Sequence, residues 1–160
     1  MTNDKIIKKE IIQRSDLKMS KTIKQISLFS ENKPGRLAKI SDVLGKEKIN
    51  IRAFTIAESG DFGIIRLVVD NPDAAHSVLK REGFTVSETE VIAVEISDEP
   101  GSLKDVAELF AEGSINIDYA YAFIGKNQKA ILIVRVSDLN SALVFLEGKN
   151  VSLLKISDFN

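Results

Sequence analysis

A six-residue motif occurs twice in this chain of 160 residues, and the second copy begins 66 residues after the first. The first copy, Asn-Lys-Pro-Gly-Arg-Leu, occupies residues 32–37, and the second, Asp-Glu-Pro-Gly-Ser-Leu, occupies residues 98–103. We call these segments the first corner and the second corner. Each follows an alternating apolar run, typical of a strand, and precedes an apolar periodicity typical of a helix. Because an Ile-Asn-Ile triplet at 49–51 and 115–117 recurs at the same offset, the chain is expected to contain two copies of one folding unit.

Both halves show the same order of expected elements, βαββαβ. This order predicts an α+β protein of two tandem ferredoxin-like units, each an antiparallel sheet with helices on one face. The expected unit boundaries are 22–90 and 91–160. No linker separates them, so the β-like run 84–96 has to hold the last strand of one unit and the first strand of the next. Other strands are expected at 24–30, 50–57, 63–70, 116–124, 130–136 and 151–156, and helices after residues 35, 71, 101 and 138. Asn71 or Asp73 is expected to cap the second helix, and Asp138 to cap the last helix, which Gly148 closes.

The third expected strand of each unit is apolar at consecutive positions, as in the Ile-Leu-Ile-Val run at 131–134. A sheet with helices on only one face normally alternates between apolar and polar residues. We therefore expect the second face of these strands to be covered as well, by the other unit or by another chain. The pattern favours a homodimer or a larger assembly.

Composition excludes several function classes. The chain has no cysteine and one histidine, His76, which argues against disulfides, thiolate nucleophiles and Cys-ligated metals. A net charge of −1 gives no field that would attract nucleic acid, and no apolar run approaches the roughly 18 residues of a membrane span. There is no Ser/His/acid set and no glycine-rich phosphate loop. We expect a cytoplasmic protein with no catalytic residue, no metal, no cofactor, and neither nucleic acid nor membrane as a partner.

The first 21 residues differ from the rest and form a basic extension. Through Lys24 there are seven basic residues and three acidic ones. Only Ile7 and Ile11 share a helical spacing, so no amphipathic helix is indicated. We expect a frayed tail, or a start at Met19, rather than an arm that binds a partner.

With two βαββαβ units, two Pro-Gly corners and two Ile-Asn-Ile triplets, the sequence resembles the ACT domain family over both units. The resemblance implies a regulatory module that binds amino acids or similar small ligands, and not an enzyme. In that family, units pair side by side, and a ligand lies under the corner of one unit and beside the second strand of its neighbour. If the two units pair within the chain, Asn32 faces Asn116 and Asp98 faces Asn50.

The resemblance also supplies a set of expected ligand-binding residues. Backbone N–H groups after Gly35 or Gly101 would bind a carboxylate. The side-chain oxygen of Asn32 or Asp98 would accept hydrogen bonds from an ammonium group. The alternative is that each corner simply turns a strand into a helix. The complete expected set is Asn32, Pro34, Gly35, Arg36, Leu37, Asn50, Ile51, Asp98, Pro100, Gly101, Ser102, Leu103, Asn116 and Ile117.

Three features leave the ligand, the occupancy of the two sites and the partner open. The two corners differ, with Asn32 and Arg36 in the first and Asp98 and Ser102 in the second, so the two sites need not be equivalent and one can be empty. Serine-binding members of the family have a histidine two residues before the corner asparagine, whereas this chain has Ser30 and Ile96 there. The segment Glu-Asn-Lys-Pro-Gly at 31–35 also resembles the small subunit of acetolactate synthase, a non-catalytic regulatory subunit of a biosynthetic enzyme. That subunit has a different C-terminal domain, whereas here the second half repeats the first.

Overall fold

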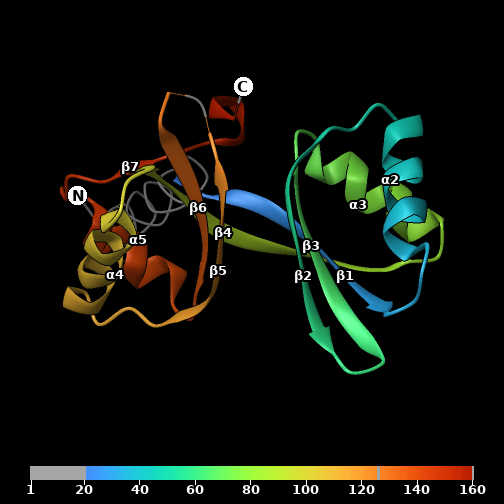
Figure 1. Cartoon of the computed structure of the whole chain (residues 1–160), viewed down its shortest axis with the longest axis horizontal. Coiled ribbons are helices and arrows are strands. Elements are labelled where there is room, and N and C mark those ends of the chain that lie inside the picture. Colours follow the sequence, from blue (N-terminus) through green and yellow to red (C-terminus); the bar gives the residue numbers. More distant parts are fainter. Residues whose placement is uncertain (1–20, 126, 160) are drawn as a thin grey trace, which may run out of the picture. The chain divides into compact units, whose positions relative to one another are not determined.

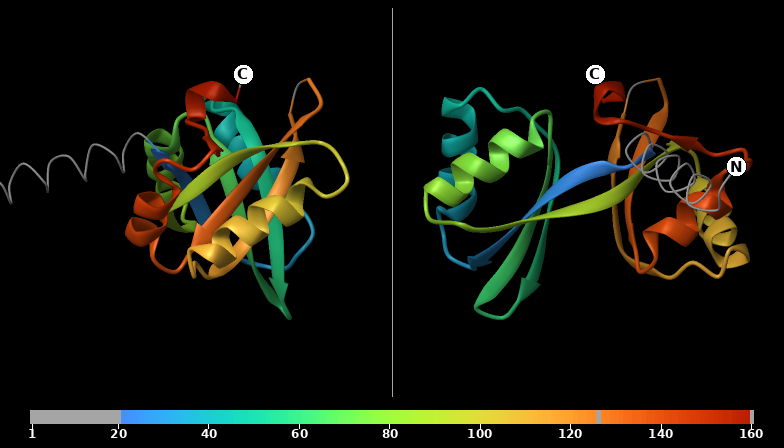
Figure 2. Two further views of the ribbon diagram at one scale, coloured as in Figure 1. Left: turned by 90° about the vertical axis from the view of Figure 1, so that its left-hand side faces the viewer. Right: turned by 180° about the vertical axis from the view of Figure 1, so that it is seen from behind.

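The computed structural model of this chain describes residues 21–125 and 127–159, so residues 1–20 of the expected basic extension lie outside it. The chain divides into two compact units, which we call the first unit (24–90) and the second unit (91–158). In each, two helices lie against one face of an antiparallel sheet (Figure 1). Figure 2 shows the same layering within each unit from two further sides. The tandem α+β architecture predicted from the repeat is therefore confirmed.

The first unit follows the βαββαβ order. Its elements are β1 (Ile23–Glu31), α2 (Arg36–Lys46), β2 (Ile51–Ser59), β3 (Phe62–Val69), α3 (Pro72–Arg81) and the beginning of β4 (Thr85–Ser97). The strands are arranged β2-β3-β1-β4, and β3 runs antiparallel to both of its neighbours. The end of β1 and the hairpin between β2 and β3 consequently lie at the same end of this sheet, where Glu31 is the register partner of Phe62.

The second unit repeats this order, beginning with the rest of β4. Its further elements are α4 (Ser102–Glu112), β5 (Ile117–Ile124), β6 (Lys129–Val136), α5 (Leu139–Leu146), β7 (Ser152–Leu153) and a 3-10 turn (Ile156–Asp158). The strands are arranged β4-β6-β5, with β7 paired to β4. The β-like run that the sequence assigns to both units is thus one strand, β4, of 13 residues.

The expected last strand at 151–156 is wrong in its length, because β7 contains two residues. The strand pairing extends only as far as the N–H of Leu154, which donates to the carbonyl of Ala93 at 2.8 Å. The carboxylate of Asp158 then accepts the N–H of Lys155 at 2.7 Å, and the N–H of Asp158 donates to the carbonyl of Lys155 at 2.9 Å. These local bonds close a turn in place of a continued ladder.

Each unit has its own apolar core between the helices and the sheet. In α2 the side chains of Ile40, Val43 and Leu44 are buried, and their spacing places them on one face of the helix. In α4 the equivalent side chains are Val106 and Phe110. Strand β6 is buried at every position from 130 to 134, as its unbroken apolar sequence predicts.

Two helices begin at the side-chain caps that the sequence predicts. Asn71 accepts the N–H of Ala74 at 3.2 Å, and Asp138 accepts the N–H of Ser141 at 3.1 Å. Such caps satisfy N–H groups that have no partner inside the helix. They fix the starts of α3 and α5.

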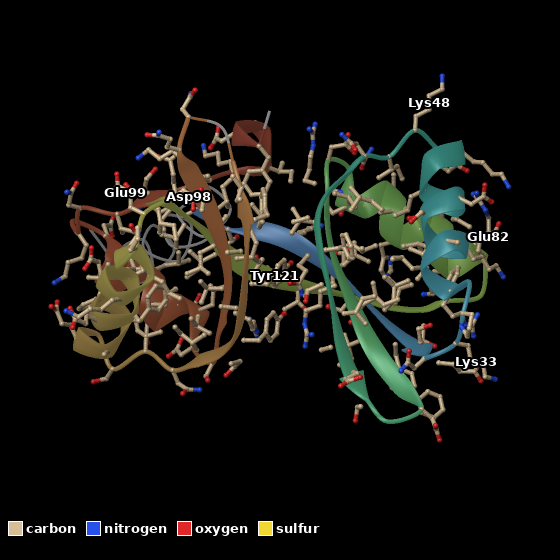
Figure 3. The ribbon with its side chains drawn as sticks, viewed as in Figure 1. Lys33, Lys48, Glu82, Asp98, Glu99 and Tyr121 are labelled. Atoms are coloured by element: carbon tan, nitrogen blue, oxygen red, sulfur yellow. The ribbon has the colours of Figure 1, made fainter. Side chains whose placement is uncertain are left out.

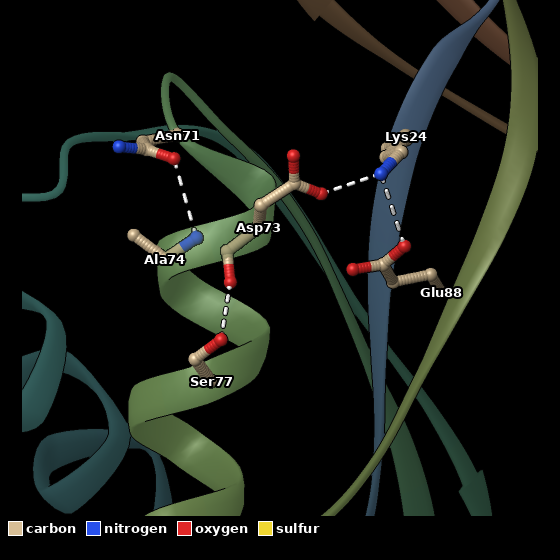
Figure 4. A network of polar contacts seen from close by, with 6 residues as sticks. All are labelled: Lys24, Asn71, Asp73, Ala74, Ser77 and Glu88. Carbon is tan, nitrogen blue, oxygen red and sulfur yellow. Dashed lines mark hydrogen bonds and ion pairs between the residues drawn. The ribbon is translucent and has the colours of Figure 1, made fainter.

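A surface ion network joins three elements of the first unit (Figure 4). The ammonium group of Lys24 in β1 bonds the carboxylate of Asp73 in α3 and lies 3.3 Å from the carboxylate of Glu88 in β4. The pKa of Lys24 is raised, chiefly by the hydrogen bond from its ammonium group to Asp73. Because the Lys24 side chain is 45% exposed, solvent screening limits the contribution of this network to stability.

Candidate functional site

The backbone at the two corners has one unusual conformation in common. Gly35 has a φ of 85° and Gly101 a φ of 100°, in the left-handed region that side chains disfavour. The helix begins at the next residue in both units, which confirms the strand-to-helix turn predicted from the motif. Because the N-cap residue of α2 and of α4 is a glycine, it has no side chain to cap the first N–H groups of its helix. The N–H groups of Arg36 and Ser102 donate to the carbonyls of Lys33 and Glu99 at 3.3 Å. The following N–H groups of each first turn, with the positive end of the helix dipole, can therefore bind an anion such as a carboxylate.

Each corner is fastened to the neighbouring hairpin of its own unit by one backbone hydrogen bond. The N–H of Asn32 donates to the carbonyl of Asp61 at 2.8 Å. The N–H of Asp98 donates to the carbonyl of Gln128 at 2.9 Å. Since these bonds use the backbone, the side chains of both corner residues remain available. Figure 3 shows Asp98 with its neighbour Glu99 before α4, and Lys33 before α2.

A pocket lies beside the first corner, and we call it the first pocket. Its volume is about 90 Å³. Besides the predicted residues Asn32, Arg36 and Leu37, it is lined by Glu31 and Glu58. Four of the residues that line it are charged: Glu31, Lys33, Arg36 and Glu58.

Three of the charged side chains that line the first pocket are paired with one another. The carboxylate of Glu31 lies 3.2 Å from the ammonium group of Lys33 and 3.3 Å from the guanidinium group of Arg36. The pKa of Glu31 is lowered, first by its hydrogen bond with Lys33, then by the charge of Lys33 and by Arg36. The three side chains therefore form one cluster of ion pairs in the lining of this pocket.

A second pocket lies beside the second corner, and it differs in size and chemistry. Its volume is about 260 Å³. The predicted residues Asp98, Ser102 and Leu103 line it together with Phe123 and Ile124 from the end of β5. Apart from the corner acids and two serines, its walls are apolar.

The two strand-two asparagines lie away from the corner of their own unit. Asn50 precedes β2 at the end of the sheet where Ile51 pairs with Val69, opposite the end where the first corner lies. Asn116 occupies the same place before β5, where Ile117 pairs with Val136. The structure therefore brings the corner residues together with a hairpin, and it does not bring Asn50 or Asn116 to the pocket of the same unit.

The amide groups of these asparagines have different surroundings. The side chain of Asn116 donates to the hydroxyl of Ser137 at 3.2 Å and to the carboxylate of Asp118 at 3.3 Å. The side chain of Asn50 forms no hydrogen bond with any residue that the structure describes, although its backbone N–H donates to the carboxylate of Asp70 at 3.0 Å. The Asn50 amide is thus the freer of the two.

Four further predicted residues lie against the apolar cores or in the corner turns. Ile51 and Ile117 are partly buried and pack against the two apolar cores. Pro34 and Pro100 are exposed and belong to the corner turns. The prediction in turn omitted Glu58 and Ile124, at the ends of β2 and β5. Their place could have been found from the topology, because a hairpin beside the first strand of a βαββαβ unit lies next to its corner.

Other kinds of site find no support in the described residues. Over residues 21–125 and 127–159, no cluster of three or more His, Asp or Glu side chains is placed to hold a metal ion. In the same segments, no helix is both long and apolar enough to cross a membrane.

Comparison with known families gives one decisive match. A family model described as an ACT domain pair matches residues 21–159. The chain belongs to the ACT domain family. The two units are therefore ACT units, and the match includes both corners, both pockets and both strand-two asparagines.

Solved structures support this assignment. Protein BT0572 from Bacteroides thetaiotaomicron is 39% identical, with a TM-score of 0.81, over 87% of this chain and 96% of that one. The ligand-free regulatory subunit of aspartate kinase from Thermus thermophilus is 17% identical, with a TM-score of 0.57, over 78% of this chain and 91% of that one. The corresponding subunit from Thermus flavus is 16% identical, with a TM-score of 0.55, over 78% and 90%. No curated protein matches the chain. The aspartate kinase subunits share the ACT fold with this chain.

Proposed function

We propose that this ACT domain pair is a non-catalytic regulatory protein that binds a small molecule, most simply an amino acid, at its corner pockets. The observation that carries the proposal is the pocket beside each uncapped helix start. Backbone N–H groups after Gly35 or Gly101 are suited to a carboxylate, and Asn32 or Asp98 to an ammonium group. Asn50 and Asn116 would complete each site from a neighbouring ACT unit, as the family resemblance implies.

The protein is proposed to act in the cytoplasm as a homodimer or a larger assembly. Binding would be coupled to regulation if the ligand had a higher affinity for one assembly or packing state than for another. Light scattering with and without amino acids measures both the assembly and its response. A monomer under both conditions would remove this part of the proposal.

A thermal-unfolding screen of the amino acids tests the binding itself. A ligand present at 100 times its Kd adds about 2.7 kcal/mol to the free energy of unfolding. The chain should therefore be stabilised clearly by at least one amino acid. Stabilisation by none of them at millimolar concentration would contradict the proposal.

A second candidate is a separate regulatory subunit of an amino-acid biosynthetic enzyme. The fold is shared with aspartate kinase regulatory subunits, and the segment 31–35 resembles the acetolactate synthase small subunit. A tagged chain purified from its native lysate distinguishes the candidates. Recovery of an aspartate kinase or acetolactate synthase catalytic subunit in equal amount would favour the second candidate, and recovery of the chain alone would favour a stand-alone sensor.

A further inference from the structure

We propose that the second pocket alone is the ligand site of this chain, and that its ligand is an amino acid with an apolar side chain. This inference rests on the proposed function and makes it more specific. It follows from a comparison of the two pockets, which occupy equivalent places in the repeat but differ at nearly every charged position.

The first pocket has little room and little free charge. Its volume is about 90 Å³, against about 300 Å³ at the lower end for pockets that hold drug-sized ligands. The carboxylate of Glu31 is shared between Lys33 and Arg36, at 3.2 and 3.3 Å. A ligand carboxylate at this corner would have to compete with Glu31 for both cations.

The charges of the first pocket are replaced at the equivalent positions of the second. Sixty-six residues on, Glu31 is replaced by Ser97, Arg36 by Ser102, and Glu58 by Ile124. The internal ion pairs are therefore absent by sequence, and the volume rises to about 260 Å³. This volume suits a molecule smaller than a drug, such as a free amino acid.

The walls of the second pocket indicate an apolar side chain on the ligand. Leu103 is 59% exposed and Ile124 is 75% exposed, although both are large apolar residues that line the pocket. Ala122 and Leu132, which lie on the same face of the sheet as Ile124, extend this apolar surface. A ligand side chain of the leucine, isoleucine or phenylalanine type would cover this surface and remove it from water.

The negative charges at the rim of the second pocket indicate that its ligand carries a cationic group. Asp98 and Glu99 form no ion pair or side-chain hydrogen bond with any residue that the structure describes. The first unit has Asn32 and Lys33 at these positions, so the second corner has gained negative charge. An ammonium group is attracted here, and an acidic ligand side chain is repelled. An apolar amino acid combines the ammonium group with the apolar body.

Calorimetric titration of the full chain with L-leucine, L-isoleucine, L-phenylalanine and L-glutamate tests the inference. At least one apolar amino acid should bind at one molecule per chain, and glutamate should bind at least tenfold more weakly. D98N should lower the affinity for the apolar amino acid about 10- to 100-fold, since it removes a charge-assisted hydrogen bond to the ligand's ammonium group. I124E and S102R, which install the charged side chains of the first pocket, should do the same. D105N, the matched control, removes a charge from the first turn of α4 outside this pocket and should leave binding within twofold.

The outcomes separate this inference from the proposed function. Preferred binding of glutamate, two ligands per chain, or loss of binding in N32A but not in D98N would overturn the inference and leave an amino-acid sensor standing. Binding of no amino acid would overturn both. Because the substituted side chains lie at the pocket surface, an unchanged melting temperature of each free variant separates lost binding from lost folding.

Discussion

Asn50 and Asp70 bind each other in both directions. The N–H of Asn50 donates to the carboxylate of Asp70 at 3.0 Å, and the N–H of Asp70 donates to the carbonyl of Asn50 at 3.1 Å. The pair fastens the start of β2 to the residue that follows β3. In the second unit the N–H of Ser137 donates to the carbonyl of Asn116 at 3.3 Å, so the repeat preserves half of this arrangement.

The Asp70 side chain is therefore expected to stabilise the first unit. D70A should lower the free energy of unfolding by about 0.5–1 kcal/mol, because an exposed hydrogen bond is lost. D70N keeps an oxygen acceptor and should lose less. Urea unfolding measures both variants. An equal loss in D70A and D70N would show that the carboxylate charge, and not the bond to Asn50, is responsible.

Glycine is required at the first corner because of its backbone angle. G35A should destabilise the protein by about 1–2 kcal/mol, since alanine is strained at a φ of 85°. Space is not the cause, because a Cβ atom at Gly35 would have nothing within 4 Å. The matched control is Gly45, inside α2, where a Cβ atom also has free space but φ is not positive. G45A should stabilise by about 0.5–1 kcal/mol, and loss of stability in G45A would refute the argument.

The sequence was sufficient to predict the features that depend on short stretches of chain. The 66-residue offset predicted two equivalent units, and Pro-Gly predicted the positions where α2 and α4 begin. Asn71 and Asp138 predicted two helix caps. These features are determined by local backbone preferences and by side-chain bonds to neighbouring residues, so one sequence contains nearly all of the relevant information.

Which of the two pockets is open could not be predicted in the same way, although the sequence shows that Asn32 and Arg36 are replaced by Asp98 and Ser102 in the second unit. It depends on whether Arg36 extends toward Glu31 or toward a ligand, which is decided by side-chain rotamers and by the distance between β1 and α2. The short β7 was missed for a similar reason. The apolar run at 151–156 satisfies the strand pattern, but the bond between Asp158 and Lys155 competes with the ladder.

Stability should depend on pH through Asp138. The pKa of this carboxyl group is lowered, first by the hydroxyl of Ser141, which donates to it at 2.6 Å, and then by the N–H of the same residue. A carboxyl group whose folded pKa is depressed contributes stability above its unfolded pKa, near 3.8, and that contribution is lost as the pH falls through the folded value. Urea unfolding between pH 7 and pH 2 should give a higher free energy of unfolding for wild type than for D138N at neutral pH. The two values should converge as the pH falls.

The variant S141A checks the cause of this shift. Without the hydroxyl group, the pKa of Asp138 should move back toward its ordinary value, which carboxyl-carbon NMR measures directly. An unchanged pKa in S141A would assign the shift to the backbone N–H groups alone.

Neighbouring residues of α5 should differ widely in their contribution to stability. Leu143 is 3% exposed and belongs to the core of the second unit, whereas Val144, the next residue, is 57% exposed. L143A should lower the free energy of unfolding by about 2–5 kcal/mol, because it removes buried apolar contacts and leaves a cavity. V144A should change it by no more than about 0.5 kcal/mol. Helix propensity favours alanine over both residues, and over valine by a few tenths of a kcal/mol more, which is small beside the expected difference, so urea unfolding of the pair measures burial. A loss in V144A as large as that in L143A would show that Val144 is covered in solution by a partner.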